Sequence, residues 1–302
     1  MKKIVSKCIS LCLVIALCVG VFPFIQYSAK AAVIGDVDKD GSLTINDASC
    51  LQGYLAKIYS ADSLDLTVAD ISGDGRVTIF DVAEMMIRLA NPSLYNPLYG
   101  KKIANFGDSV GAGDGAGGYG YAQFLRYRNR MKLTEKAKDG CNLAVTDARD
   151  DDICNTVKSI EGDFDYILVE GGYNDVFRKL TIGEVSDSKD IEDFDETTVC
   201  GAVESICYTL TNKFSSAKKL FVLGHKKEGI YEQQQALVWS AIKTVLDKWE
   251  IPYVDITEET GFTSSTYEGD GVLFNRNDGT HPTKYGYEKY YVPVIESKLM
   301  QL

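Results

Sequence analysis

Short apolar runs alternate with amphipathic stretches over the last two-thirds of the chain. Buried strands are predicted where the apolar runs lie, at residues 103–106, 166–169, 220–223 and 253–256, and residues 132–137 are a candidate for one more strand. Helices are predicted where apolar residues recur at helical spacing, at residues 197–214, 231–249 and 284–299. Strands that alternate with helices predict a parallel sheet between helical layers, an α/β fold whose sites form at the carboxyl ends of the strands.

The N-terminus has the pattern of an export signal. A basic stretch comes first, residues 8–25 are almost wholly apolar, and Ala29-Lys30-Ala31 is a small-x-small cleavage pattern. We therefore expect residues 1–31 to be a signal peptide and the mature protein to be secreted. The apolar run is also long enough for an uncleaved anchor, which stays open as an alternative. No later stretch is apolar enough to span a bilayer, so we expect no membrane association after cleavage.

Composition narrows the possible partners. Hydrophobic residues make up 45% of the 302 residues and charged residues 25%, which excludes wholesale disorder. The formal net charge of −11 argues against a general nucleic-acid binder, because such proteins need a basic surface. An acidic chain is compatible with a cation such as Ca²⁺ or with a neutral polymer. The five cysteines beyond the signal are odd in number and widely spread, so they predict no disulfide framework.

A twelve-residue acidic pattern occurs twice, and its copies begin 34 residues apart, at Asp36 and Asp70. Each copy has oxygen-bearing side chains at positions 1, 3, 5, 9 and 12 and glycine at position 6, the spacing of an EF-type calcium loop. Position 7 supplies a backbone carbonyl. Ser72 replaces a carboxylate, so the second site is expected to be the weaker one. The predicted metal-binding residues are Asp36, Asp38, Asp40, Ser42, Asp47, Asp70, Ser72, Asp74, Arg76 and Asp81.

An amphipathic helix is predicted after each loop, but the first loop has no room for an incoming helix. A loop followed by one helix, duplicated, with Asp at position 12, resembles the dockerin module of cellulosomal proteins over about residues 33–92. This resemblance implies a small all-α module with two structural Ca²⁺ ions. It also implies a cohesin domain of a scaffoldin as partner and an extracellular, cellulosome-associated location.

In dockerins, recognition uses loop positions 10 and 11 and the following helix. The resemblance therefore implies cohesin contacts by Ile45, Asn46, Ile79, Phe80 and Met86. The second half is the more apolar one, so we expect a single preferred cohesin face built on it. Internal packing of Phe80 and Met86 is the alternative.

Three polar segments fall at predicted strand ends or after the last strand: Gly107-Asp108-Ser109, the stretch at residues 171–175, and the stretch at residues 278–282. A serine hydroxyl is a weak nucleophile until a base takes its proton, and His281 is the natural base for Ser109. Asp278, three residues earlier, can orient that imidazole. Asn174 could donate an N–H to a developing oxyanion, together with backbone N–H groups near Ser109.

The order and spacing of these blocks resemble the GDSL/SGNH hydrolase superfamily over about residues 100–300. The resemblance implies a three-layer α/β/α, flavodoxin-like fold and ester hydrolysis. Its residue roles carry over as Ser109 nucleophile, His281 base and Asp278 orienting acid, with Ser109 and Asn174 in the oxyanion hole. Gly140 is the best candidate for the family's glycine donor, although the usual asparagine of that block is missing. We expect no cofactor in catalysis.

Residues 107–111 also spell the Gly-x-Ser-x-Gly elbow of α/β-hydrolases. That fold places several strands before its nucleophile, whereas Ser109 follows the first predicted strand, so we reject this alternative. His225 is expected either to line the cleft or to be structural. The acidic segment at residues 177–195 is expected either to gate substrate access or to be a surface excursion.

We therefore predict a secreted cellulosomal carbohydrate esterase that deacetylates xylan or a related plant cell-wall polysaccharide by a Ser-His-Asp acyl-enzyme mechanism. A lipase or thioesterase of the same superfamily, and a non-catalytic scaffold-bound binding subunit, are the alternatives. Calcium loops that are purely structural, with no scaffold partner, are a third possibility. The predicted segments are the signal peptide at 1–31, the dockerin at 32–92, a linker at 93–99 and the hydrolase domain at 100–302.

Overall fold

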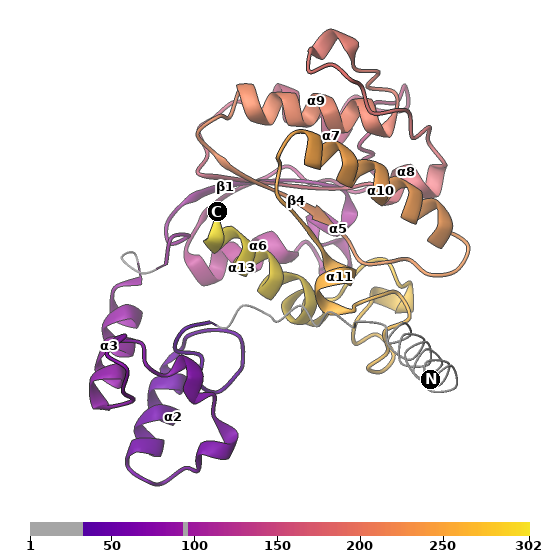
Figure 1. Ribbon diagram of the computed structural model, residues 1–302. Coiled ribbons are helices and arrows are strands. Elements are labelled where there is room, and N and C mark those ends of the chain that lie inside the picture. The colour runs from indigo at the N-terminus through magenta and orange to yellow at the C-terminus, as the bar shows by residue number, and fades with distance from the viewer. Residues whose placement is uncertain (1–32, 93–95) are drawn as a thin grey trace, which may run out of the picture. The chain divides into compact units, whose positions relative to one another are not determined.

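The computed structural model describes residues 33–92 and 96–302 (Figure 1). The predicted signal peptide lies outside the described residues, as does part of the predicted linker. Within the described ranges, no helix combines the length and the apolar character that crossing a bilayer requires.

The N-terminal module consists of two helices and the loops that precede them. Helix α2 spans Ile45–Leu55 and helix α3 spans Ile79–Ala90, with short 3₁₀ turns at Ala61–Ser63 and Leu66–Val68. Each helix begins at a threonine whose hydroxyl accepts a backbone N–H, and the aspartate three residues into the helix bonds back to that threonine's N–H. The buried core consists of Val37, Ala48, Leu51, Val68, Ala69, Ile71, Val82 and Met85.

The C-terminal domain is built on one sheet of five strands in the order β2-β1-β3-β4-β5. Every neighbouring pair is parallel, which confirms the predicted parallel sheet. Parallel strands covered on both faces need apolar side chains on both faces, which explains the continuous apolar runs in the sequence. The strands are β1 (Lys102–Phe106), β2 (Lys132–Glu135), β3 (Tyr166–Glu170), β4 (Lys218–Leu223) and β5 (Tyr253–Asp255).

Helices cover both faces of this sheet, so the domain has three layers. Figure 1 shows α7, α8, α9 and α10 on one face and α6, α11 and α13 on the other. The α/β/α architecture predicted from the sequence is therefore confirmed. The helices are α5 (Ser109–Ala112), α6 (Tyr121–Asn129), α7 (Ile153–Ser159), α8 (Tyr173–Arg178), α9 (Val199–Asn212), α10 (Glu232–Lys248), α11 (Ile256–Thr260), α12 (Lys284–Gly286) and α13 (Val292–Gln301).

Two predicted elements end differently in the structure. The last strand stops at Asp255, because the Asp255 side chain accepts the N–H groups of Thr257 and Glu258 and thereby starts α11. The helix predicted at residues 284–299 is divided into α12, a π-helical turn at Tyr287–Tyr291, and α13. Shorter 3₁₀ turns lie at Asp114–Ala116, Ile191–Asp193 and Asn275–Asn277.

Candidate active site and calcium loops

Ser109 lies where β1 ends, as the first residue of α5. The side chain of Asp108 accepts the N–H of Val110 at 2.8 Å and caps this short helix. Glycine is required on both sides of the serine, because a Cβ atom at Gly107 or Gly111 would lie within 3 Å of the Glu170 carboxyl group. The tight turn thus presents the Ser109 side chain at the carboxyl edge of the sheet, 5% exposed.

The structure brings His281 to this serine across 172 residues of sequence. The Ser109 Oγ atom lies 2.9 Å from His281 Nε2, and His281 Nδ1 lies 2.7 Å from Asp278 Oδ2. The Asp278 carboxylate can only accept, so the proton sits on Nδ1 and Nε2 is free to accept from the serine hydroxyl. The other Asp278 oxygen accepts the backbone N–H groups of Thr280 and His281 at 2.7 and 2.9 Å, which fixes the carboxylate relative to the ring.

These contacts set the protonation of the pair. The hydrogen bond that His281 donates to Asp278 raises the pKa of His281 above its ordinary value, against the opposing effect of partial burial. Burial by itself raises the pKa of Asp278, but the hydrogen bonds from the His281 ring and the two N–H groups outweigh it and leave that pKa low. The pair therefore consists of an ionised carboxylate and an imidazole that is a stronger base than a free histidine.

Three groups are candidate oxyanion donors. In the part of the chain that the structure describes, the backbone N–H groups of Ser109 and Gly140 donate to no protein acceptor. The third group is the Asn174 side chain, but its Nδ2 atom donates to the carbonyl of Cys141 at 2.9 Å and to Asp108 Oδ2 at 3.2 Å. Both amide hydrogens of Asn174 are thus engaged, so stabilising an oxyanion requires one of these bonds to be exchanged.

Two buried carboxyl groups to which the sequence assigned no role in the chemistry support this site. Glu170, the last residue of β3, accepts the N–H groups of Asp108 and Gly111 at 3.2 and 2.9 Å, and burial raises its pKa well above the ordinary value. Asp175 accepts the N–H groups of Leu143 and Ala144 and holds the segment next to Gly140. In the sequence, Glu170 could have been recognised as a carboxylate residue at the end of an otherwise apolar strand.

The first acidic loop gathers three carboxylates. Asp36, Asp38 and Asp40 can each place one oxygen within 4.8 Å of the others. Burial, followed by the charges of neighbouring aspartates, raises the pKa of Asp36. Its Oδ1 atom is buried and has no hydrogen-bond partner among the described residues. An unpaired, buried carboxylate oxygen beside two more carboxylates fits Ca²⁺, which takes six to eight oxygen ligands.

The second acidic loop is arranged differently. Both Asp70 oxygens are used within the loop: they accept the N–H groups of Gly73, Asp74 and Gly75 and the hydroxyl of Ser72. The Ser72 hydroxyl therefore points at another ligand residue. This loop presents fewer free oxygen atoms than the first one, in line with the expected weaker site.

Apolar side chains on α3 face solvent. Ile79 is 56% exposed, Phe80 72% and Met86 46%, and Ile87 next to Met86 is also exposed. The alternative that Phe80 and Met86 pack internally is thus excluded. On α2, Ile45 is exposed but its neighbour Asn46 is polar, so of the two helices α3 presents the larger exposed apolar surface.

Comparison with protein families decides what the two parts are. The GDSL-like lipase/acylhydrolase family model matches residues 103–291, and the dockerin type I domain model matches residues 34–90. The chain belongs to the GDSL-like lipase/acylhydrolase family. It also carries a dockerin domain, which implies binding to a cohesin of a scaffoldin and an extracellular, cellulosome-associated protein. Both resemblances inferred from the sequence are confirmed.

Two solved structures are similar to this chain. A protein from Lactobacillus plantarum is 22% identical, with a TM-score of 0.54, over 67% of this chain and 96% of that one. A variant of an acetyl-xylooligosaccharide esterase from Geobacillus is 15% identical, with a TM-score of 0.45, over 67% of this chain and 94% of that one. Both likenesses concern the GDSL domain. Among curated proteins, a search finds no match to the chain.

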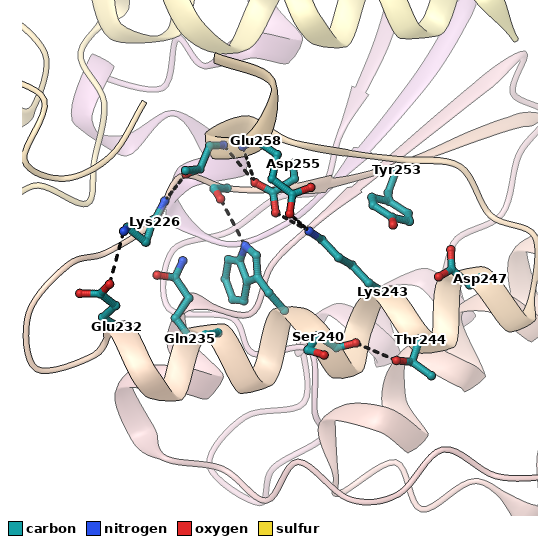
Figure 2. Close-up of a pocket in the computed structure, with 14 residues that line it drawn as sticks. Lys226, Glu232, Gln235, Ser240, Lys243, Thr244, Asp247, Tyr253, Asp255 and Glu258 are labelled. Atoms are coloured by element: carbon teal, nitrogen blue, oxygen red, sulfur yellow. Dashed lines mark hydrogen bonds and ion pairs between the residues drawn. The ribbon is translucent and has the colours of Figure 1, made fainter. Parts of the chain in front are cut away.

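A cavity of about 560 Å³ in the GDSL domain lies apart from Ser109. Figure 2 shows it between α10, β5 and α11, with Lys243 directed at Asp255 and Glu258. The Lys243 ammonium lies 2.8 Å from Asp255 and 2.7 Å from Glu258 and pairs with both carboxylates. The residues that line this cavity include none of the Ser109, Asp278 and His281 group, and we assign it no part in the chemistry.

The acidic segment at residues 177–195 packs on the helical layer. The Lys248 ammonium on α10 donates to the carbonyls of Ser186 and Ser188 at 2.6 and 2.5 Å and pairs with the buried Glu204. Phe194 meets the ring of Trp249 edge to face, with centroids 6.1 Å apart. Because an ion pair with a buried carboxylate and aromatic contacts hold this segment, we favour its interpretation as a surface excursion over that as a substrate gate.

Proposed function

We propose that this protein is a cellulosomal carbohydrate esterase that uses Ser109, His281 and Asp278 as a catalytic triad. A GDSL-family domain joined to a dockerin supports an esterase-type hydrolase attached to a cellulosome. The main support for the triad is a chain of two hydrogen bonds. The first joins Ser109 Oγ to His281 Nε2 at 2.9 Å, and the second joins His281 Nδ1 to Asp278 Oδ2 at 2.7 Å. This is the arrangement that activates a serine for acyl transfer.

In the first half-reaction, Ser109 Oγ attacks the ester carbonyl while its proton moves to His281 Nε2. The imidazolium that forms is stabilised by the Asp278 carboxylate, and it then gives its proton to the departing sugar oxygen. The products of this step are the free alcohol and an acyl group on Ser109. In the second half-reaction, His281 takes a proton from water as the water oxygen attacks the acyl carbonyl. The protonated His281 then returns that proton to Ser109 Oγ when the bond between Oγ and the acyl carbon breaks and the acid leaves.

The tetrahedral intermediates carry negative charge on the former carbonyl oxygen. The N–H groups of Ser109 and Gly140, which have no acceptor among the described residues, can donate hydrogen bonds to this oxygen. The Asn174 amide can also donate to it when it gives up its bond to Cys141 or Asp108. A donor of this kind typically contributes 10²–10³-fold to the rate. The same site needs no cofactor for these steps.

The substrate we propose is an acetylated plant polysaccharide, with xylan as the first choice. The side chains of His281 and Asp278 are 25% and 35% exposed, so the reacting groups lie near the surface, where an ester on a polymer can reach them. A net charge of −11 suits a neutral polymer better than an acidic one. A dockerin would raise the local concentration of the esterase beside glycanases that act on the same polymer.

For the dockerin, we propose two structural Ca²⁺ ions and one preferred cohesin face. The exposed residues Ile79, Phe80 and Met86 form that face, with a smaller contribution from Ile45 and Asn46. Hydrophobic anchors of this kind dominate many interfaces. The proposed segment limits are a signal peptide at 1–31, the dockerin at 32–92, a linker at 93–99 and the hydrolase at 100–302, which makes the mature protein secreted.

The deciding experiment is an assay panel with acetylated xylan, feruloylated arabinoxylan and p-nitrophenyl esters of increasing chain length. We expect acetate release from xylan to be fastest and Ser109→Ala to abolish it. A clear preference for long acyl esters would replace the polysaccharide by a lipid-type substrate. Turnover that is unchanged in Ser109→Ala would remove Ser109 as nucleophile, and absence of turnover on every ester would favour a binding subunit.

A further inference from the structure

His225 lies just beyond the end of β4 and is fully buried, yet it is no member of the proposed triad. Its ring packs among aromatic side chains, with centroids 5.0 Å from Phe262 and 5.1 Å from Phe274. Burial lowers the pKa of His225 to about 4, so the ring is neutral in the folded protein near neutral pH. A neutral, buried imidazole has one donor and one acceptor to satisfy.

The hydrogen bonds of this ring define its tautomer. His225 Nε2 lies 3.2 Å from the carbonyl oxygen of Gly279, which can only accept, so Nε2 carries the proton. His225 Nδ1 then accepts, and the hydroxyl of Tyr291 lies 2.7 Å from it. The ring is thereby held from both sides, by a tyrosine hydroxyl and by a backbone carbonyl.

The carbonyl that His225 holds belongs to the loop carrying the proposed acid and base. Gly279 directly follows Asp278 and lies two residues before His281. Gly279 has φ +63°, and a Cβ atom there would lie only 3.0 Å from the Ser264 side chain, so the backbone passes through a narrow space. The Lys227 ammonium, two residues beyond His225, donates to the carbonyl of Asp278. The segment after β4 therefore binds two consecutive carbonyls of this loop.

We propose that His225 is a positioning residue, which fixes the Asp278–His281 loop against the sheet by donating its Nε2 proton to Gly279. This inference rests on the proposed function, because it concerns the geometry of that triad. A displacement of about 1 Å at a reacting group can cost on the order of 10²-fold in rate. The bond from His225 therefore keeps His281 Nε2 within reach of the serine hydroxyl.

A matched pair of variants tests this. The amide nitrogen of Gln can occupy the place of His225 Nε2, whereas that of Asn reaches only the place of Nδ1. In the full-length protein, we expect His225→Asn to slow the labelling of Ser109 by a fluorophosphonate on the order of 30-fold and to move the pH midpoint of labelling. We expect His225→Gln to stay within about threefold of wild type. Val203→Ala, in the buried face of α9, is the control for general destabilisation.

Wild-type protein gives a test that needs no variant, because the chain contains only two histidines. In protein labelled with ¹⁵N-histidine, we expect one ring to be the neutral Nε2–H tautomer throughout the activity range and the other to titrate with activity. An Nδ1–H tautomer of His225, or equal labelling rates in His225→Asn and Val203→Ala, would overturn the positioning role and leave the triad standing. Wild-type protein that no fluorophosphonate labels, or labelling that persists in Ser109→Ala, would instead overturn the proposed function.

Discussion

The first acidic loop and the proposed triad both collect polar groups at one point, but over very different lengths of chain. The loop takes its acidic residues from twelve consecutive positions, and a glycine in the middle lets the backbone turn around the place where a Ca²⁺ ion would bind. The triad joins Ser109 to His281 across 172 residues and depends on the whole sheet. A local site should therefore tolerate damage elsewhere in the protein, whereas a site assembled at a distance should respond to changes far from its reacting atoms.

The largest loss of ester hydrolysis is expected when the nucleophile is removed. Ser109→Ala should lower kcat/KM for an acetyl ester by about 10⁴- to 10⁶-fold, because no other group can form the acyl intermediate. Ester hydrolysis is measured by acetate release. Binding to a cohesin should stay the same, since the two sites are separate. Loss of both properties together would indicate misfolding rather than lost chemistry.

A smaller loss should follow when the orienting acid becomes neutral. Asp278→Asn keeps the side-chain shape, but it removes the charge that stabilises the imidazolium, so kcat should fall about 10³- to 10⁴-fold. In wild type, activity should fall as the pH drops through the pKa of His281, which the bond to Asp278 raises. In the variant, this acid limb should move to lower pH. An unmoved limb would show that another group controls the base.

The local site should respond to metal and leave the chemistry alone. Removal of Ca²⁺ by a chelator should weaken cohesin binding by about 100-fold or more, because ion binding and folding of the loops are coupled. Asp36→Ala should cause most of this loss and Asp70→Ala less, given the unpaired Asp36 oxygen. Calorimetric Ca²⁺ titration and cohesin pull-down measure this. Chelation that stops ester hydrolysis to the same degree would contradict the separation of the sites.

The two halves of the dockerin should differ in affinity. Phe80→Ala removes the most exposed aromatic side chain of the proposed cohesin face and should cost about 2 kcal/mol of binding, roughly 30-fold in Kd. Ile45→Ala, on the first helix, should cost about 0.5 kcal/mol or less. Surface plasmon resonance on an immobilised cohesin compares them. Equal losses would mean that both halves bind.

The smallest expected effect concerns stability and the buried His225. Its pKa of about 4 in the folded protein lies below the ordinary value of 6.5, so the unfolded chain takes up a proton first as the pH falls. Between about pH 7 and pH 5.5, this should lower the free energy of unfolding by about 1 kcal/mol. Denaturant titration of wild type and His225→Asn at both pH values isolates the effect. An identical pH dependence in the two proteins would contradict it.

Several features were readable from the residues alone. Short motifs indicate both families. The duplicated loop spacing indicates the dockerin, and the hydrolase is indicated by the Gly107-Asp108-Ser109, Asn174-Asp175 and Asp278–His281 blocks. The apolar runs located β1, β3, β4 and β5 to within a few residues, because strands buried on both faces require such runs; the edge strand β2 is less buried and has no such run. The helices α5, α6, α7, α8 and α11 were not predicted; all but α6 have fewer than eight residues and show too little periodicity.

What the sequence determined by itself is everything that depends on spacing within a few residues: the calcium loops, the helix starts at Thr44 and Thr78, and the glycines beside Ser109. What only the tertiary structure decided is which distant polar groups meet. Glu170 contacts the serine turn and His225 contacts the triad loop because parallel strands end at one edge of the sheet. Such contacts depend on strand order and register, which no local pattern encodes.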